Sequence, residues 1–207
     1  VLSMPIKQVK IQDDLSKTHC NWLKEKFKNI EVKDISLDSV FDQFQSALSN
    51  YNSEHAYANS KARIRMTTLY QVAGSSNGIV VGTGNKVEDF GVGFYTKYGD
   101  GGVDLSPIAD LMKSEVYALA KELGVPESIQ VAKPTDGLWG DDRSDEDQIG
   151  ATYDELEWAM YQDEKGKTVD DFEGREQKVF SIYKGFNNAN KHKMEPIPVC
   201  EIPNELK

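Results

Sequence analysis

Residues 78–88 read GIVVGTGNKVE, an apolar run that passes directly into small and polar residues. Residues 78–83 are the clearest strand in the sequence, because the run is short and apolar and a glycine turn closes it. Helical patterns precede and follow it, and strands that alternate with helices predict an α/β fold with a parallel sheet flanked by helices. Such sheets bind ligands beyond the carboxyl ends of their strands, so the turn after Val81 is the first candidate site.

Hydrophobic periodicity on either side of this strand predicts the remaining elements. Further strands are expected at residues 1–6 and 30–35. Helices are expected at residues 13–27, 38–48, 55–73, 108–123, 153–161 and 170–189, and another begins after Ser144. Gly124 and Pro126 end the helix at 108–123 in the usual way, and the tail after Met194 is expected to be irregular.

The chain has 207 residues, of which 39% are hydrophobic and 28% are charged, as in a globular protein of one domain. Lys and Arg number 24 against 34 Asp and Glu, which sets the net charge at −10. Nucleic acids and membrane surfaces are bound through broad positive patches, so this balance argues against both as partners. It is compatible with a local cluster of cations and leaves an anionic small molecule as a candidate ligand.

Cys20 and Cys200 lie far apart in the sequence and show neither zinc-site nor CxxC spacing. Two isolated cysteines fit a reducing cytoplasm, although a single disulfide between them stays open. No apolar run approaches the roughly 20 residues that span a bilayer, and the N-terminus shows no signal-peptide pattern. The predicted location is the cytoplasm.

The turn that follows the strand at 78–83 has two interpretations. Its small residues would let a nucleotide approach the backbone, Thr83 offers a hydroxyl, and Glu88 is a hard oxygen ligand for Mg²⁺. Alternatively, the turn is only a helix start, with Thr83 as its cap and Glu88 solvated near the positive end of the helix. Val87 stands where a dinucleotide-binding fingerprint would need its third glycine.

A second loop, residues 95–104, contains Lys97, three glycines and Asp104. Free backbone N–H groups beside a lysine suit a phosphate or carboxylate, whereas the alternative is a tight turn with a surface lysine. Asp104 is a candidate either for binding ribose hydroxyls or for capping the loop. Lys113, in the helix that follows, is either directed at phosphates or solvated.

Other charged residues give weaker signals. Arg63 and Arg65 are two residues apart on a helix, so at most one of them faces a given site. The acidic run at residues 141–147 fails the EF-hand pattern and is interpreted as a solvated helix start capped by Ser144. His192, between two lysines, is a basic tail or an anion clamp, and the three histidines show no zinc or catalytic spacing.

Taken together, several segments make the chain resemble the ammonia-dependent NAD synthetases and the equivalent domain of the glutamine-dependent enzymes. The segments run in order from about residue 55 to residue 195, with gaps like those of the family. They are KARIRM (61–66), GTGNKVED (82–89), FYTKYGDGGVDLSP (94–107), the Lys113 helix, KPTDGLW (133–139), DED (145–147) with Gly150 and Tyr153, and HK (192–193).

This resemblance implies a fold of the adenine-nucleotide α-hydrolase type, a Rossmann-like three-layer arrangement of a parallel sheet between helices, in a homodimer. It implies a ligase that forms a C–N bond: deamido-NAD, ATP and ammonia would give NAD, AMP and pyrophosphate through an adenylate intermediate. Mg²⁺ and lysines would stabilise the charge on the departing pyrophosphate. No residue resembles a covalent nucleophile, so catalysis would consist mostly of positioning and electrostatics.

The resemblance also implies roles for individual residues. Glu88 matches the position of the Mg²⁺ ligand. The positions that match ATP contacts are Thr83, Lys113 and Thr135. The positions that match deamido-NAD contacts, some of them across the dimer interface, are Arg63, Lys97, Asp104, His192 and Lys193.

One feature of the family is missing from the 207 residues. The pyrophosphate-binding loop Ser-Gly-Gly-x-Asp-Ser, which follows the first strand of the family and supplies an aspartate for Mg²⁺, does not occur. Residues 1–207 are therefore expected to form a single synthetase domain without its first strand, loop and helix, a unit on the order of 30 residues. Three explanations stay open: residues that lie upstream, a truncated gene product, or a protein that has lost catalysis.

Ammonia-dependent amidation of deamido-NAD is the leading functional hypothesis. One alternative is the synthetase part of a glutamine-dependent system, in which another polypeptide would supply ammonia. The other is a non-catalytic nucleotide-binding or dimerisation module. Release of AMP that requires every substrate would separate the enzymes from the module.

Overall fold

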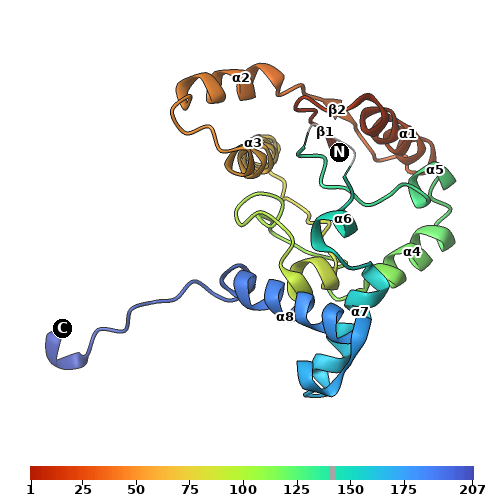
Figure 1. Ribbon diagram of the computed structural model, residues 1–207. Helices are drawn as coiled ribbons and strands as arrows, with labels where there is room; N and C mark the ends of the chain where they lie inside the picture. Colours follow the sequence, from red (N-terminus) through yellow and green to blue (C-terminus); the bar gives the residue numbers. More distant parts are fainter. Residues whose placement is uncertain (140–142) are drawn as a thin grey trace.

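A computed structural model describes residues 1–139 and 143–207 of the chain. Figure 1 shows a helix-rich molecule in which two short strands lie beside α1, while the C-terminal tail extends away from the body. The elements are β1 (Leu2–Ser3), α1 (Lys10–Lys26), β2 (Lys33–Asp34), α2 (Asp38–Ala47), α3 (Glu54–Ser75), η1 (Val87–Val92), α4 (Lys113–Glu122), α5 (Glu127–Gln130), α6 (Asp145–Ile149), α7 (Tyr153–Glu164), η2 (Val169–Asp171), α8 (Gly174–Met194) and η3 (Asn204–Leu206). η1 is a π-helix, and η2 and η3 are 3₁₀-helices. No helix in the described ranges has the length and apolarity that a membrane span requires.

Two pairs of extended segments, both parallel, confirm the predicted α/β class. β1 pairs with β2, with Leu2 opposite Lys33. Val81 bridges Leu105, and the N–H of Gly82 donates to the carbonyl of Leu105 at 2.7 Å. The strands are shorter than predicted, because the described hydrogen bonds join these segments in two separate pairs and not in one continuous sheet. The strand at 78–83 is thus reduced to a bridge.

The two faces of the strand segment at Val81 differ sharply in burial. Val80 is 3% exposed, whereas Ile79, Val81 and Leu105 are 65%, 53% and 52% exposed. Ile79 and Val81 share one face, because side chains alternate along a strand. Strands of a parallel sheet are normally buried on both faces. This apolar surface, which we call the open sheet face (Ile79, Val81 and Leu105), is left uncovered by the part of the chain that the structure describes.

The larger core lies where η1, α7 and α8 pack together, and Figure 1 shows α7 and α8 side by side. Val92, Leu156 and Phe180 are almost completely buried there. The rings of Phe172 and Phe180 lie 5.1 Å apart between their centroids, and Trp158 packs edge-on against both. This aromatic packing joins α7, α8 and the segment between them.

The smaller core consists of Ile6, Leu37 and Phe41, beneath β1 and α2. The ring of Phe41 meets Tyr57 of α3 edge to face, with centroids 6.0 Å apart. Partly buried side chains complete this cluster, including Ile64 of α3. It joins the N-terminal elements to α3.

Some helix boundaries differ from the prediction, whereas α2 and α3 lie within two residues of theirs, α6 begins after Ser144 as predicted, and α7 begins at Tyr153 as predicted but extends to Glu164. α1 begins at Lys10 and not at Asp13, because the Val9 carbonyl already accepts from the Asp13 N–H at 3.2 Å. α4 begins at Lys113, because residues 107–110 form a turn and Met112 is extended, with its N–H donating to Glu115 Oε2. α8 begins later and extends further than 170–189, since residues 169–171 form η2. Apart from η3, the tail is irregular as predicted.

Candidate active site

Asn85 shapes the turn between the Val81 bridge and η1, and it is 2% exposed. Its Oδ1 accepts hydrogen bonds from the N–H groups of Val87 and Glu88, both at 3.1 Å. Asn85 therefore caps this helical segment, so the alternative interpretation of Thr83 as the cap is wrong. The cap orients the first turn of η1 and with it the Glu88 side chain.

Glu88 and Lys113 form an ion pair that joins η1 to the start of α4. Lys113 Nζ donates to Glu88 Oε1 at 2.7 Å, and the Lys113 and Glu88 side chains are 17% and 18% exposed. A pair this shielded from water is screened less by salt than an exposed one. The structure thus brings the expected metal ligand and one expected ATP contact together, and neither is a solvated surface charge.

Tyr153, the first residue of α7, contacts both members of this pair. Its hydroxyl donates to Glu88 Oε1 at 2.6 Å and lies 3.1 Å from Asp145 Oδ2. Its ring faces Lys113, with the ammonium 4.6 Å from the ring centroid. We call these four residues the Glu88 cluster (Glu88, Lys113, Asp145 and Tyr153).

Two members of the Glu88 cluster, Asp145 and Tyr153, have raised pKa values. Burial, and then the charge of Glu88, raise the pKa of Asp145 to about 6. Burial and the two nearby carboxylates also raise the pKa of Tyr153 above its usual range. The phenol therefore keeps its proton at neutral pH, and a single proton can be donated to only one carboxylate at a time.

The residue pattern by itself predicts no chemical role for Asp145 or Tyr153. Asp145 stands in the first turn of α6, where acidic residues are usually solvated. That interpretation fits exposed Asp147, whose Oδ2 accepts from the Ser144 N–H at 3.0 Å, but it is wrong for Asp145, which is 7% exposed. Their presence in segments that resemble one family was the only signal. Residues 141 and 142 of the same acidic run lie outside the described residues.

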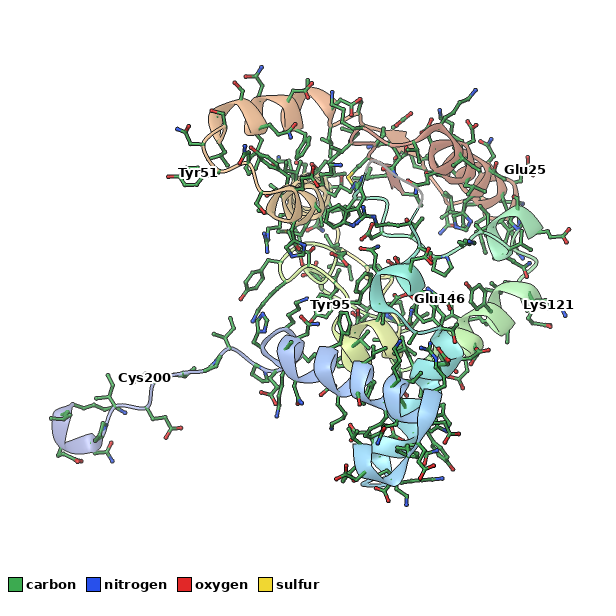
Figure 2. All side chains as sticks on the ribbon, in the orientation of Figure 1. Glu25, Tyr51, Tyr95, Lys121, Glu146 and Cys200 are labelled. Atoms are coloured by element: carbon green, nitrogen blue, oxygen red, sulfur yellow. The ribbon has the colours of Figure 1, made fainter. Side chains whose placement is uncertain are left out.

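A second group of expected site residues, the cation group (Arg63, Lys97, His192 and Lys193), lies where α3, the loop after η1 and the end of α8 meet. Arg63 Nε donates to the Lys97 carbonyl at 3.2 Å, and Lys97 Nζ donates to the His192 carbonyl at 2.5 Å. Lys193 Nζ donates to the carbonyls of Gly93 and Tyr95, both at 2.8 Å. Figure 2 shows Tyr95 close to α8.

Arg65 points elsewhere, as its spacing from Arg63 predicts. Arg65 Nε donates to the Met4 carbonyl at 3.1 Å, and its guanidinium also donates to Gln8 Oε1 at 3.0 Å. Burial lowers the pKa of both Arg65 and Lys193. Of the two arginines, Arg63 belongs to the cation group and Arg65 does not.

Asp104 is held by the strand pair. The N–H of Val80 donates to Asp104 Oδ2 at 2.8 Å, and the hydroxyl of Tyr70 donates to Oδ1 at 3.0 Å. Thr83 and Thr135 are both exposed. Thr135 Oγ1 donates to the Arg143 carbonyl at 3.2 Å, and none of the hydrogen bonds between described residues connects Thr135 to the Glu88 cluster. The three expected ATP contacts are therefore not all joined by direct contacts within the chain.

The Glu88 cluster suits a metal ion that is bound together with a nucleotide. The described ranges contain no group of three or more His, Cys, Asp or Glu side chains that could hold a metal by themselves. Mg²⁺ in nucleotide sites usually takes one or two carboxylates and completes its coordination with phosphates and water. Glu88 fits that donor set, and Asp145 places beside it a buried Oδ1 that has no hydrogen-bond partner.

The amino-acid sequence is similar to those of several curated proteins. Curated relatives named NH(3)-dependent NAD(+) synthetase include those of Methanococcoides burtonii, 45% identical over 62% of this chain and 49% of the relative, and Archaeoglobus fulgidus, 42% identical over 84% and 66%. The relative from Syntrophomonas wolfei is 39% identical over 89% of this chain and 72% of its own length. The chain spans about half the length of several curated relatives that it matches.

Two solved structures resemble the whole described fold. The NMN synthetase from Francisella tularensis superposes with a TM-score of 0.81 at 30% identity, covering 98% of this chain and 77% of that one. The NH3-dependent NAD synthetase from Campylobacter jejuni gives a TM-score of 0.70 at 27% identity, covering 97% and 77%. The NAD synthase family profile matches residues 1–197. The chain therefore belongs to the NAD synthase family.

Proposed function

We propose that this chain is the synthetase part of an enzyme that amidates deamido-NAD with ammonia, releasing AMP and pyrophosphate from ATP. The observation that carries the proposal is the shielded Glu88–Lys113 pair, 2.7 Å apart, beside the end of a parallel strand pair. Parallel α/β sheets place their nucleotides at such ends. The similarity to proteins named NH(3)-dependent NAD(+) synthetase supports the choice of reaction.

The chemistry requires activation of a carboxylate. A carboxylate is a poor electrophile, so transfer of AMP from ATP converts it to a mixed anhydride, and ammonia then displaces AMP. Lys113 would stabilise negative charge on the phosphates, with Thr83 and Thr135 as further ATP contacts. Glu88 would hold Mg²⁺, which when bound neutralises charge on the phosphates. With no covalent nucleophile assigned, the protein contributes orientation and electrostatics.

The cation group is proposed to bind deamido-NAD. Its members Arg63, Lys97, His192 and Lys193 come from segments up to 130 residues apart (193 − 63) and converge on one another through the contacts described above. Asp104, anchored by Val80 and Tyr70, would accept hydrogen bonds from ribose hydroxyls. We further propose a cytoplasmic homodimer in which some of these contacts cross the interface.

A further strand, loop and helix are proposed to complete this domain. The open sheet face exposes three apolar side chains that a parallel sheet normally covers. A helix packed on Ile79, Val81 and Leu105 would bury them, and its preceding loop would carry the Ser-Gly-Gly-x-Asp-Ser sequence. The intact mass of the purified natural protein tests this, because a mass near 23.2 kDa would contradict it.

The enzymatic test uses the natural full-length protein with deamido-NAD, ATP, Mg²⁺ and an ammonium salt. We expect NAD and AMP to form in equal amounts and only when all four are present. Glu88→Ala should abolish the Mg²⁺-dependent reaction, whereas Tyr183→Phe should leave it intact. Binding of ATP without any turnover would support the non-catalytic module, and turnover with glutamine in a partner's presence would support the glutamine-dependent system.

A second candidate substrate follows from the structural comparison. The structure with a TM-score of 0.81 is an NMN synthetase, and the acid that yields NMN on amidation is nicotinate mononucleotide. The same activation chemistry applies, because both acids present a nicotinate carboxylate. The ratio of kcat/KM for deamido-NAD and nicotinate mononucleotide, measured side by side, decides between the two substrates.

A further inference from the structure

Tyr153 occupies an unusual position for a residue without an assigned role. It is 4% exposed and opens α7, and its N–H donates to Glu146 Oε1 of α6 at 2.9 Å. Thr152 caps the same helix, since its Oγ1 accepts from the Glu155 N–H at 3.3 Å. The backbone of Tyr153 is therefore tied to two helices, and its side chain has little freedom to move.

The side chain contacts both charged groups on which the proposed nucleotide site depends. Its hydroxyl donates to the Glu88 carboxylate at 2.6 Å, and its ring lies beside the Lys113 ammonium at 4.6 Å from the centroid. These contacts differ in kind, because the first fixes an acceptor and the second attracts a cation to an aromatic face. One neutral residue thus orients a carboxylate and an ammonium at the same time.

We propose that Tyr153 is a positioning residue that holds the Glu88 carboxylate and the Lys113 ammonium in the arrangement that binds a metal–ATP complex. The proposal rests on the proposed function for the identity of the nucleotide. Groups that orient a metal-binding carboxylate commonly change metal affinity by about 10- to 100-fold when they are removed. Loss of the hydroxyl alone should therefore weaken metal binding without removing any ligand.

The chain offers a matched control in Tyr183 of α8. Tyr183 is 5% exposed, and its hydroxyl lies 3.2 Å from Asp163 Oδ2, so it too is a buried tyrosine that contacts a carboxylate. Asp163 and Tyr183 have no contact with the Glu88 cluster among the hydrogen bonds of the described residues. Replacing either tyrosine by phenylalanine removes one hydroxyl and keeps the ring.

The experiment compares Tyr153→Phe, Tyr183→Phe and wild type in the full-length protein. Binding of Mn²⁺, a paramagnetic substitute for Mg²⁺, is titrated by electron paramagnetic resonance with saturating ATP, and the unfolding midpoint in urea is measured in parallel. We expect Tyr153→Phe to raise the Mn²⁺ dissociation constant about 10-fold, while Tyr183→Phe leaves it unchanged. The two midpoints should fall by similar amounts.

A steady-state measurement adds a second readout. Tyr153→Phe should raise the half-saturating Mg²⁺ concentration more than it lowers kcat. Tyr153→Leu also removes the ring beside Lys113, so it should raise the KM for ATP more than Tyr153→Phe does. Equal Mn²⁺ binding by all three proteins would overturn the proposal, whatever their stabilities. Failure of the proposed function is distinguishable, because wild type would then bind Mn²⁺ and ATP but form no NAD.

Discussion

The two hydrophobic cores differ in size and in how completely their side chains are buried. Around η1, α7 and α8, aromatic and aliphatic side chains such as Leu156 and Phe180 are fully enclosed. Beneath β1 and α2 the buried set consists of Ile6, Leu37 and Phe41, and the side chains that complete this core are only partly buried. The Glu88 cluster is built on elements of the deeper core or next to them. The charged site is therefore built next to the larger of the two cores, in which more side chains are fully enclosed.

The largest expected losses of stability come from removing one large aromatic ring from each core. Phe180→Ala should lower the free energy of unfolding by about 4 kcal/mol, because the cavity lies among Trp158, Phe172 and Tyr183. Phe41→Ala should cost about 3 kcal/mol or less, since its partly exposed neighbours can close the gap. Urea denaturation of the two variants measures the difference. An equal or larger loss for Phe41→Ala would show that the two cores are equivalent.

Replacement of valine by threonine, a residue of nearly equal shape, compares the larger core with the open sheet face. Val92 is 0% exposed, so Val92→Thr buries a hydroxyl and should cost about 2 kcal/mol of unfolding free energy. Val81→Thr, on the open sheet face, should change it by less than about 0.5 kcal/mol in the 207-residue chain. The same pair measured in a longer natural protein sharpens the test, because a covering helix would raise the cost at Val81.

The N-terminal caps of α6 and α3 provide a third comparison. Ser144 is 4% exposed, and its Oγ accepts from the Asp147 N–H at 3.1 Å, whereas exposed Ser53 accepts from the Ala56 N–H at 3.4 Å. Ser144→Ala should therefore cost about 1 kcal/mol, and Ser53→Ala about half of that. Thermal unfolding monitored by circular dichroism gives both values. A larger loss at Ser53 would contradict the stronger cap at α6.

A surface ion pair is also expected to have a small effect, and this effect depends on pH. Hydrogen bonds from Arg175 lower the pKa of Glu155 to about 2, so the ionised form is favoured in the folded state. The stabilisation is therefore present above the unfolded pKa near 4.5 and is lost as the pH falls toward 2. Glu155→Gln should cost about 0.5 kcal/mol at pH 7, because water screens the pair.

The measurement is the difference in unfolding free energy between wild type and Glu155→Gln, followed from pH 7 downward. It should shrink below about pH 4.5. A difference that grows on acidification would contradict the assignment. Asp42→Asn is the matched variant on the N-terminal side, where the Lys7–Asp42 pair at 2.9 Å is more exposed, and its effect should be smaller.

Local signals in the sequence determined much of the helical framework. Ser144 caps α6 as predicted, because a cap depends on residues within one turn. The family segments likewise predicted Glu88 and Lys113 as site residues, and the structure brings the two into contact. Strand lengths could not be predicted as well, because a strand is defined by hydrogen-bonding partners that lie far away in the chain. The pairing of Val81 with Leu105 shows this dependence.

Only the tertiary structure decided which side chains meet. Tyr153 contacts Glu88 across 65 residues of sequence, and Lys113 reaches it across 25. The burial of Asp145 was equally hidden, because an acidic residue in a first helical turn has the same local sequence whether water or another helix lies beside it. Local propensity acts over a few residues, whereas these contacts depend on how whole helices pack. The motifs therefore predicted which residue types would act, and the packing of η1, α4, α6 and α7 brought their side chains into contact.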